Sequence, residues 1–211
     1  MIEGDGVMFF FSKNVDFTDI AMELDRIMIR KIVPLIQKQD EKSDHVLGKE
    51  LVSLLQKVGK IRIVTFEGEP TFNFEPHYCY STGESFRKVG KYLDAIAWYL
   101  MSCTRECDFS SPYTAMAGLL KEYGKYEAAF EVYEYARKIF SDDWKVSVRM
   151  AILAYFHLRN RIGKNEFVKY MDMAMDSFYG YNGLKYRIQS LYNGIYELDG
   201  LFADYESVKG I

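Results

Sequence analysis

The chain has 211 residues, a net charge of −3, a hydrophobic content of 49% and an aromatic content of 16%. This much apolar material is enough for a sizeable core in one large domain or two small ones. The charge lacks the basic surplus typical of nucleic-acid-binding proteins, so we expect no nucleic-acid partner.

Membrane and secreted classes are also disfavoured by the sequence. The longest apolar runs, such as residues 7–11, are much shorter than the roughly 20 residues that span a bilayer. The first residues lack the basic and apolar regions of a secretory signal. With three cysteines and no such signal, a disulfide framework is not expected. We therefore expect a cytoplasmic protein without membrane contact.

The first 75 residues are predicted to form a small β-α-α-β module. Residues 7–12 and 61–66 are short apolar runs typical of buried strands, and residues 17–32 and 47–58 follow a helical period. Pro34 should kink or end the first helix because it removes a backbone donor. Two strands alone are marginal. They should therefore pair with each other, pack on the rest of the chain, or pair with a second copy in a homodimer.

A repeated pattern follows in the second part of the chain. Residues 90–99 and 124–133 share G-K-Y-x-x-A-x-x-x-Y, at an offset of 34 residues. A glycine between two apolar-periodic segments can adopt a positive φ and let the chain turn between helices. Small residues at fixed positions allow the two helices of a hairpin to approach closely. The spacing therefore predicts successive helical hairpins.

This pattern closely resembles the tetratricopeptide repeat (TPR), which has small residues, Gly, Tyr, Ala and Tyr at the matching positions. The resemblance implies a mostly α fold, a TPR-like α-α superhelix of three to four hairpins, over residues 76–211. Its repeats would span residues 76–109, 110–143, 144–181 and 182–211, with about four extra residues in the loop of the third repeat near 160–165. The last repeat would serve as the cap that a solenoid needs.

The same resemblance implies a binding surface on the concave face, which the first helix of each repeat lines. Solenoids use this face to hold peptides or helices of other proteins. Two of its residues, Lys145 and Arg149, coincide with a basic pair of the carboxylate-clamp subfamily. Tyr80 and Glu84 depart from that subfamily, so the alternative is an ordinary solvated face. The candidate partner-binding residues are Tyr80, Glu84, Arg87, Lys121, Lys145, Arg149 and Tyr155.

No pattern of catalytic residues accompanies the repeats, so we expect a protein that is not an enzyme and needs no cofactor. Four potential zinc ligands are present, but Cys79 falls at a position usually buried between helices. Buried or incidental cysteines are therefore favoured over a metal site. The four side chains are His77, Cys79, Cys103 and Cys107.

The sequence thus favours an adaptor, scaffold or chaperone that binds a peptide or helix of a partner protein. Two alternatives belong to other classes. The first 75 residues could form a catalytic or small-ligand-binding module with the repeats as a docking arm. The predicted strands could instead pair between chains, which would make the protein a self-assembling structural dimer.

Overall fold

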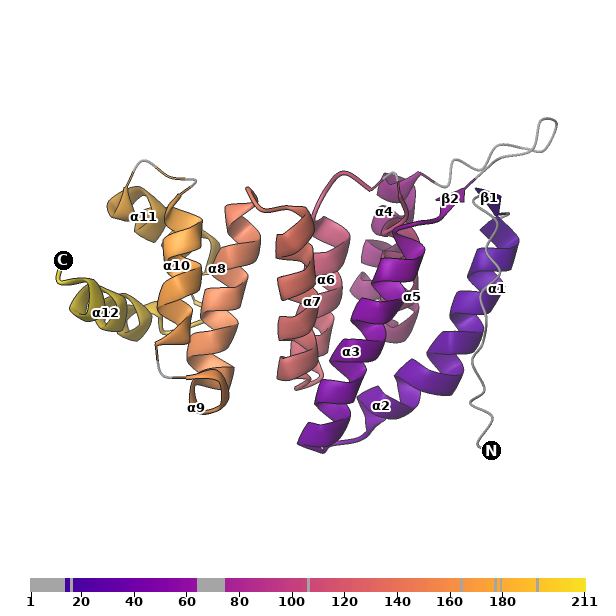
Figure 1. The fold of residues 1–211 in the computed structure, drawn as a ribbon, viewed down its shortest axis with the longest axis horizontal. Coiled ribbons are helices and arrows are strands. Elements are labelled where there is room, and N and C mark those ends of the chain that lie inside the picture. The colour runs from indigo at the N-terminus through magenta and orange to yellow at the C-terminus, as the bar shows by residue number, and fades with distance from the viewer. Residues whose placement is uncertain are drawn as a thin grey trace, which may run out of the picture.

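The computed structural model describes residues 14–15, 17–63, 75–105, 107–163, 165–176, 178, 180–192 and 194–211. In these residues the chain forms a row of helices that follow one another roughly in sequence order from one end of the molecule to the other (Figure 1). No helix in the described ranges combines the length and apolar character needed to cross a membrane.

The two copies of the repeated pattern form two similar helical hairpins. Helix α4 (Pro76–Lys88) pairs with α5 (Tyr92–Ser102), and α6 (Ser111–Glu122) pairs with α7 (Tyr126–Ile139). The turns contain Gly90 and Gly124, whose φ angles of 76° and 73° lie in the left-handed region. Residues with a Cβ rarely adopt this conformation. The prediction of helical hairpins with a glycine turn is therefore confirmed over these residues.

A close contact between helices explains the small residue at Gly83. A Cβ on Gly83 would lie 2.6 Å from Cε1 of Tyr99, whose ring is fully buried. The first helix can approach the second only because position 83 has no side chain. The equivalent residue in the next hairpin, Ala117, is fully buried as well.

The third unit has a longer first helix than the pattern predicts. Helix α8 (Trp144–Leu153) continues through the π-helical segment η2 (Ala154–Leu158) into α9 (Arg159–Ile162), and α10 (Glu166–Met175) packs back against α8. The extra residues near 160–165 therefore lengthen the helix instead of enlarging a loop. A π-helical turn inserts residues without breaking the helix, but it rotates the side chains that follow.

Two further helices complete the chain. Helix α11 (Tyr181–Tyr192) is followed by a short connector, residues 193–197, and by α12 (Leu198–Lys209). Tyr205 of α12 is buried and its hydroxyl donates a 2.8 Å hydrogen bond to Oδ1 of Asp172 in α10. The Nζ of Lys209 lies 2.9 Å from the other oxygen of the same carboxylate. These contacts attach α12 to the third unit.

The predicted β-α-α-β module is wrong, because the described part of the first 75 residues is a helical hairpin. Its first arm runs through α1 (Phe17–Ile27), the π-helical η1 (Met28–Ile32) and α2 (Val33–Gln37), and its second arm is α3 (Glu41–Val58). Extended structure in the described ranges is limited to a two-residue parallel pair, β1 (Asn14–Val15) with β2 (Arg62–Ile63). The expected strand at 7–12 lies outside the described residues.

The helices of this hairpin have apolar faces that explain the difference. Leu24 and Met28 on one arm and Leu51 and Leu55 on the other are buried in the same core as the repeats. The segment therefore extends the helical array and needs no sheet to cover its apolar surface. Pro34 stands in the first turn of α2, directly after η1. Proline cannot donate a backbone hydrogen bond, and the wider π turn of η1 lies where the regular helical bonding is interrupted.

The hairpin docks on the layer formed by α5 and α7 (Figure 1). Asp44 of α3 accepts hydrogen bonds from the backbone N–H groups of Glu127 and Ala128, at 3.0 and 2.9 Å. Lys125 is only 2% exposed and donates through Nζ to the carbonyl of Lys38. This docking covers the second helices of the repeats and leaves the layer of α4, α6 and α8 for the site described below.

Candidate functional site

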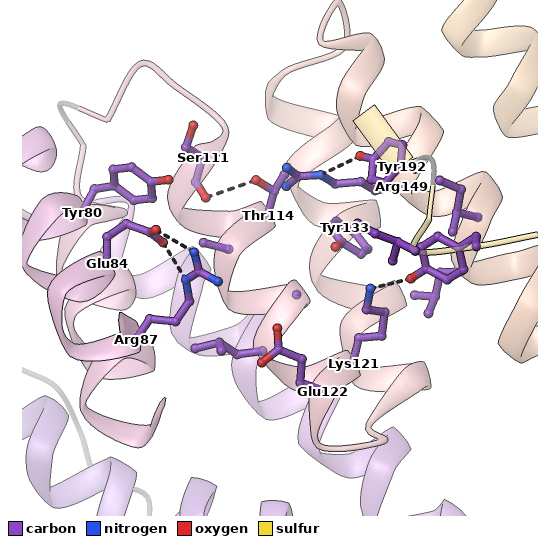
Figure 2. A pocket seen from close by; sticks show the side chains of 17 residues that line it. Tyr80, Glu84, Arg87, Ser111, Thr114, Lys121, Glu122, Tyr133, Arg149 and Tyr192 are labelled. Carbon is purple, nitrogen blue, oxygen red and sulfur yellow. Dashed lines mark hydrogen bonds and ion pairs between the residues drawn. The ribbon is translucent and has the colours of Figure 1, made fainter. Parts of the chain in front are cut away.

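A pocket of about 370 Å³ lies on the first helices of the three repeat units (Figure 2). Its walls come from α4, α6 and α8, with Tyr133 of α7 at its base and the α11–α12 connector at one side. The lining is polar and charged at the α4 end, includes Ala115, Gly118 and Leu119 on α6, and combines Arg149 with Ile152 and Leu153 on α8. Each successive hairpin contributes one wall because the array places equivalent helices side by side.

The α4 wall carries a hydrogen-bonded ion pair. Nη2 of Arg87 lies 3.0 Å from Oε2 of Glu84, and the hydroxyl of Tyr99 donates a 2.5 Å hydrogen bond to Oε1 of the same carboxylate. Partial burial raises the pKa of the Glu84 carboxyl, but the bonds from Arg87 and Tyr99 outweigh it and the net shift is downward. Glu84 therefore stays ionised, and its charge is balanced within the wall.

The α6 and α8 walls carry two cations whose hydrogen-bond partners are neutral tyrosines instead of a carboxylate. Lys121 Nζ donates a 2.5 Å hydrogen bond to the hydroxyl of Tyr196, and Arg149 Nε donates one of 3.3 Å to the hydroxyl of Tyr192. Neither cation forms an ion pair with a carboxylate among the described residues. This half of the pocket therefore presents positive charge that neutral phenol oxygens contact but do not neutralise.

Tyr192, the last residue of α11, and Tyr196 of the connector are the site residues that the sequence did not reveal. Tyr196 stacks on Phe156, with ring centroids 4.9 Å apart, and Ile195 beside it is 65% exposed. Tyr196 lies 75 positions from Lys121 in the chain. No periodic pattern predicts a contact at that separation, and the resemblance places this residue in a fourth repeat.

Five of the seven predicted binding residues come together in this pocket. Lys145 does not line it, because it lies exposed in the first turn of α8, where its N–H bonds to Asp143. Tyr155 does not line it either, because it lies in η2, packs on Phe167 and donates to Asp204. These contacts hold its side chain against α10 and α12 instead. The lining members are Tyr80, Glu84, Arg87, Lys121 and Arg149.

The cysteines and His77 are placed for packing. The ring of His77 stacks on Phe109 at 4.1 Å, and the described residues contain no group of three His, Cys, Asp or Glu side chains arranged to hold a metal ion. Burial raises the pKa of Cys79 to about 12 and that of Cys107 to about 11, so both thiols are protonated at neutral pH. Metal ligation needs the thiolate form.

A second cavity of about 420 Å³ lies between the N-terminal hairpin and the repeats. Lys60, Arg105, Cys107 and Tyr135 contribute to its walls, and no carboxylate or histidine is among the described residues that line it. An acid–base pair of the usual kind is therefore not assembled there by those residues.

Comparison of the chain with models of known protein families and with curated proteins gives no match. The interpretation of the pocket therefore depends on its own geometry and charge.

Proposed function

We propose that this chain is a protein-interaction module of the tetratricopeptide type, which holds a short peptide or helix of a partner protein in the groove on α4, α6 and α8. Its role would be that of an adaptor, scaffold or chaperone. One observation carries the proposal. The first helices of three successive hairpins bring four side chains around one cavity of about 370 Å³: Tyr80, Arg87, Lys121 and Arg149.

The arrangement suits a chain segment better than a small substrate. The groove has separate polar groups on three parallel walls, so an extended ligand can be held at several points along its length. Tyr80 and Arg87 offer hydrogen-bond donors at one end, and Lys121 and Arg149 offer charged donors at the other. Donors spaced in this way match the regularly spaced carbonyls and side chains of a peptide.

Affinity capture with matched charge-reversal variants tests this proposal. The Lys121→Glu/Arg149→Glu variant alters the groove, and the Lys42→Glu/Lys49→Glu variant makes the same change in net charge on exposed positions of α3. We expect a partner recovered by the wild-type chain and by the α3 variant to be lost with the groove variant. Equal recovery by all three folded proteins would rule out the groove as the binding site.

The structure bears differently on the two alternatives, a catalytic or ligand-binding module and a dimer paired through strands. The catalytic or ligand-binding alternative gains no support from the cavity between the hairpin and the repeats, since its described lining offers no acid–base pair. Dimerisation through pairing of residues 7–11 and 61–66 between chains depends partly on residues that the structure does not describe, and stays a prediction. The cytoplasmic location stays a prediction as well.

A further inference from the structure

The two groove cations are occupied by the chain itself. Arg149 and Lys121 donate to the hydroxyls of Tyr192 and Tyr196, which stand at the two ends of the turn that links α11 to α12. The Nζ of Lys121 also lies 5.1 Å from the centroid of the Tyr196 ring. Together with Ile195, these tyrosines line the same cavity as the helix walls.

A phenol oxygen is a weak partner for a half-buried cation. A carboxylate adds the Coulombic attraction of opposite charges, which a neutral phenol oxygen does not supply. Two described carboxylates line the groove: Glu84 is paired with Arg87 on the opposite wall, and Glu122 forms no ion pair with Lys121 or Arg149. A ligand carboxylate would therefore gain more from Lys121 and Arg149 than Tyr196 and Tyr192 do.

The connector and the helix that follows it are held by separate contacts. Among the described residues, the backbone hydrogen bonds of the connector run from Ile195 N–H to Tyr192 and from Leu198 N–H to Tyr196, both at 3.0 Å, and Tyr196 also takes part in an isolated β-bridge. Helix α12 is attached separately, through the bonds of Tyr205 and Lys209 to Asp172. Release of the connector from the groove would therefore leave the bonds that hold α12 on the third unit in place.

We propose that the α11–α12 connector is an internal occupant of the groove, and that the partner is an acidic peptide segment whose carboxylates replace the Tyr192 and Tyr196 hydroxyls on Arg149 and Lys121. This inference depends on the proposed function and adds the chemistry of the partner and a built-in competitor. The acidic side chains lie over Lys121 and Arg149, since Arg87 at the α4 end is already paired with Glu84.

The test uses the full chain and a fluorescein-labelled peptide that carries four glutamates and an amidated C-terminus. A second peptide has glutamine in place of glutamate, and a third is this glutamine peptide with a free C-terminal carboxylate. Fluorescence anisotropy measures the affinity of each. We expect the glutamate peptide to bind at least about tenfold more tightly than the amidated glutamine peptide, given the strength of charged hydrogen bonds. Equal affinities of these two would overturn the acidic class, and preferential binding of the third would assign the cations to a chain terminus.

Three variants test the role of the connector. Tyr192→Phe/Tyr196→Phe keeps both rings and removes the competing oxygens, so we expect the glutamate peptide to bind about tenfold more tightly. Tyr186→Phe, on an α11 tyrosine that is 73% exposed, is the control and should change nothing. Lys121→Gln/Arg149→Gln should lose binding. If that variant loses binding but the double Phe variant matches wild type, the connector is not a competitor.

Hydrogen exchange gives a readout that does not depend on any variant folding well. On addition of the glutamate peptide, we expect the amides of residues 194–198 to exchange faster and those of α6 and α8 to be protected. Slower exchange at 194–198 would overturn displacement of the connector. If groove-dependent capture from a lysate succeeds and the glutamate peptide fails to bind, the acidic partner is wrong and the interaction function stands. If capture also fails, the proposed function is wrong.

Discussion

The carboxylate of Asp44 in α3 accepts a 2.9 Å hydrogen bond from the backbone N–H of Ala128, in the first turn of α7. The same side chain accepts a second bond from the N–H of Glu127. The N-terminal N–H groups of a helix lack partners within it, and a carboxylate is the favoured acceptor for them. Here that acceptor comes from another helix, so capping of α7 and docking of the hairpin depend on one residue.

Removal of this cap should destabilise the fold measurably. We expect Asp44→Ala to lower the free energy of unfolding by about 1–2 kcal/mol, because two backbone donors at a buried helix end lose their acceptor. Urea unfolding followed by circular dichroism measures the change. Asp25→Ala, on an exposed position of α1, is the control and should lie within about 0.5 kcal/mol of wild type. Similar losses for both variants would contradict a capping role.

The two helical glycines of the repeats should respond to alanine in opposite directions. A Cβ at Gly83 would lie 2.6 Å from the Tyr99 ring, so we expect Gly83→Ala to destabilise the fold by about 1–3 kcal/mol. At Gly118 no atom lies within 4 Å of the added Cβ, so Gly118→Ala should stabilise α6 by about 0.5–1 kcal/mol. Thermal unfolding of the pair checks this, and a shift of both variants in one direction would contradict the packing described.

Stability should depend on the titration of His157. Burial lowers the pKa of His157 below its usual 6.5, and the nearby charge of Lys121 lowers it further. The unfolded chain then binds a proton more readily, so the contribution of His157 to stability is present above about pH 6.5 and is lost as the pH falls through the folded-state pKa. His157→Phe can retain the stacking on Tyr126 and should lose less stability than wild type between pH 7.5 and 5.5. Parallel pH curves in thermal unfolding would contradict this.

The three thiols should react slowly in the native protein. Cys79 and Cys103 are fully buried, and burial raises the pKa of both thiols, as it does for Cys107. Since the thiolate is the reactive form, Ellman's reagent at pH 8 should modify them much more slowly than a free cysteine. Cys107, which is half-buried, should react first, and Cys107→Ser should remove that phase. Unfolding in guanidinium should expose all three, whereas a chelator should change nothing in the native state.

The repeats and most of the groove could be predicted because local rules govern them. The Gly-Lys-Tyr pattern requires a turn at Gly90 and Gly124, and hairpins of one length place equivalent residues on one face. Arg87, Lys121 and Arg149 therefore reach the groove as expected. Their positions within the first helix of each repeat were sufficient to predict this convergence.

Other features depend on tertiary contacts that periodicity does not encode. Of the apolar run 61–66, the described residues form a strand at Arg62–Ile63 alone, and the apolar faces of the N-terminal helices pack on α5 and α7 instead of on a larger sheet. Contacts with Phe167 and Asp204 hold Tyr155 away from the predicted lining. Tyr192 and Tyr196 reach the groove only because the chain folds back over it after α10.

The two lysines of the shared pattern limit how this protein can evolve. Lys91 and Lys125 occupy the same position in their repeats, but Lys91 is exposed and Lys125 is buried against the carbonyl of Lys38. A hairpin inserted between these two lysines by duplication would move α7 away from α3. The buried ammonium of Lys125 would then lose the carbonyl of Lys38, or the carboxylate of Asp44 would lose the N–H groups of α7. The array is therefore not free to grow at this point, and lineages that vary the number of repeats should add them beyond α10.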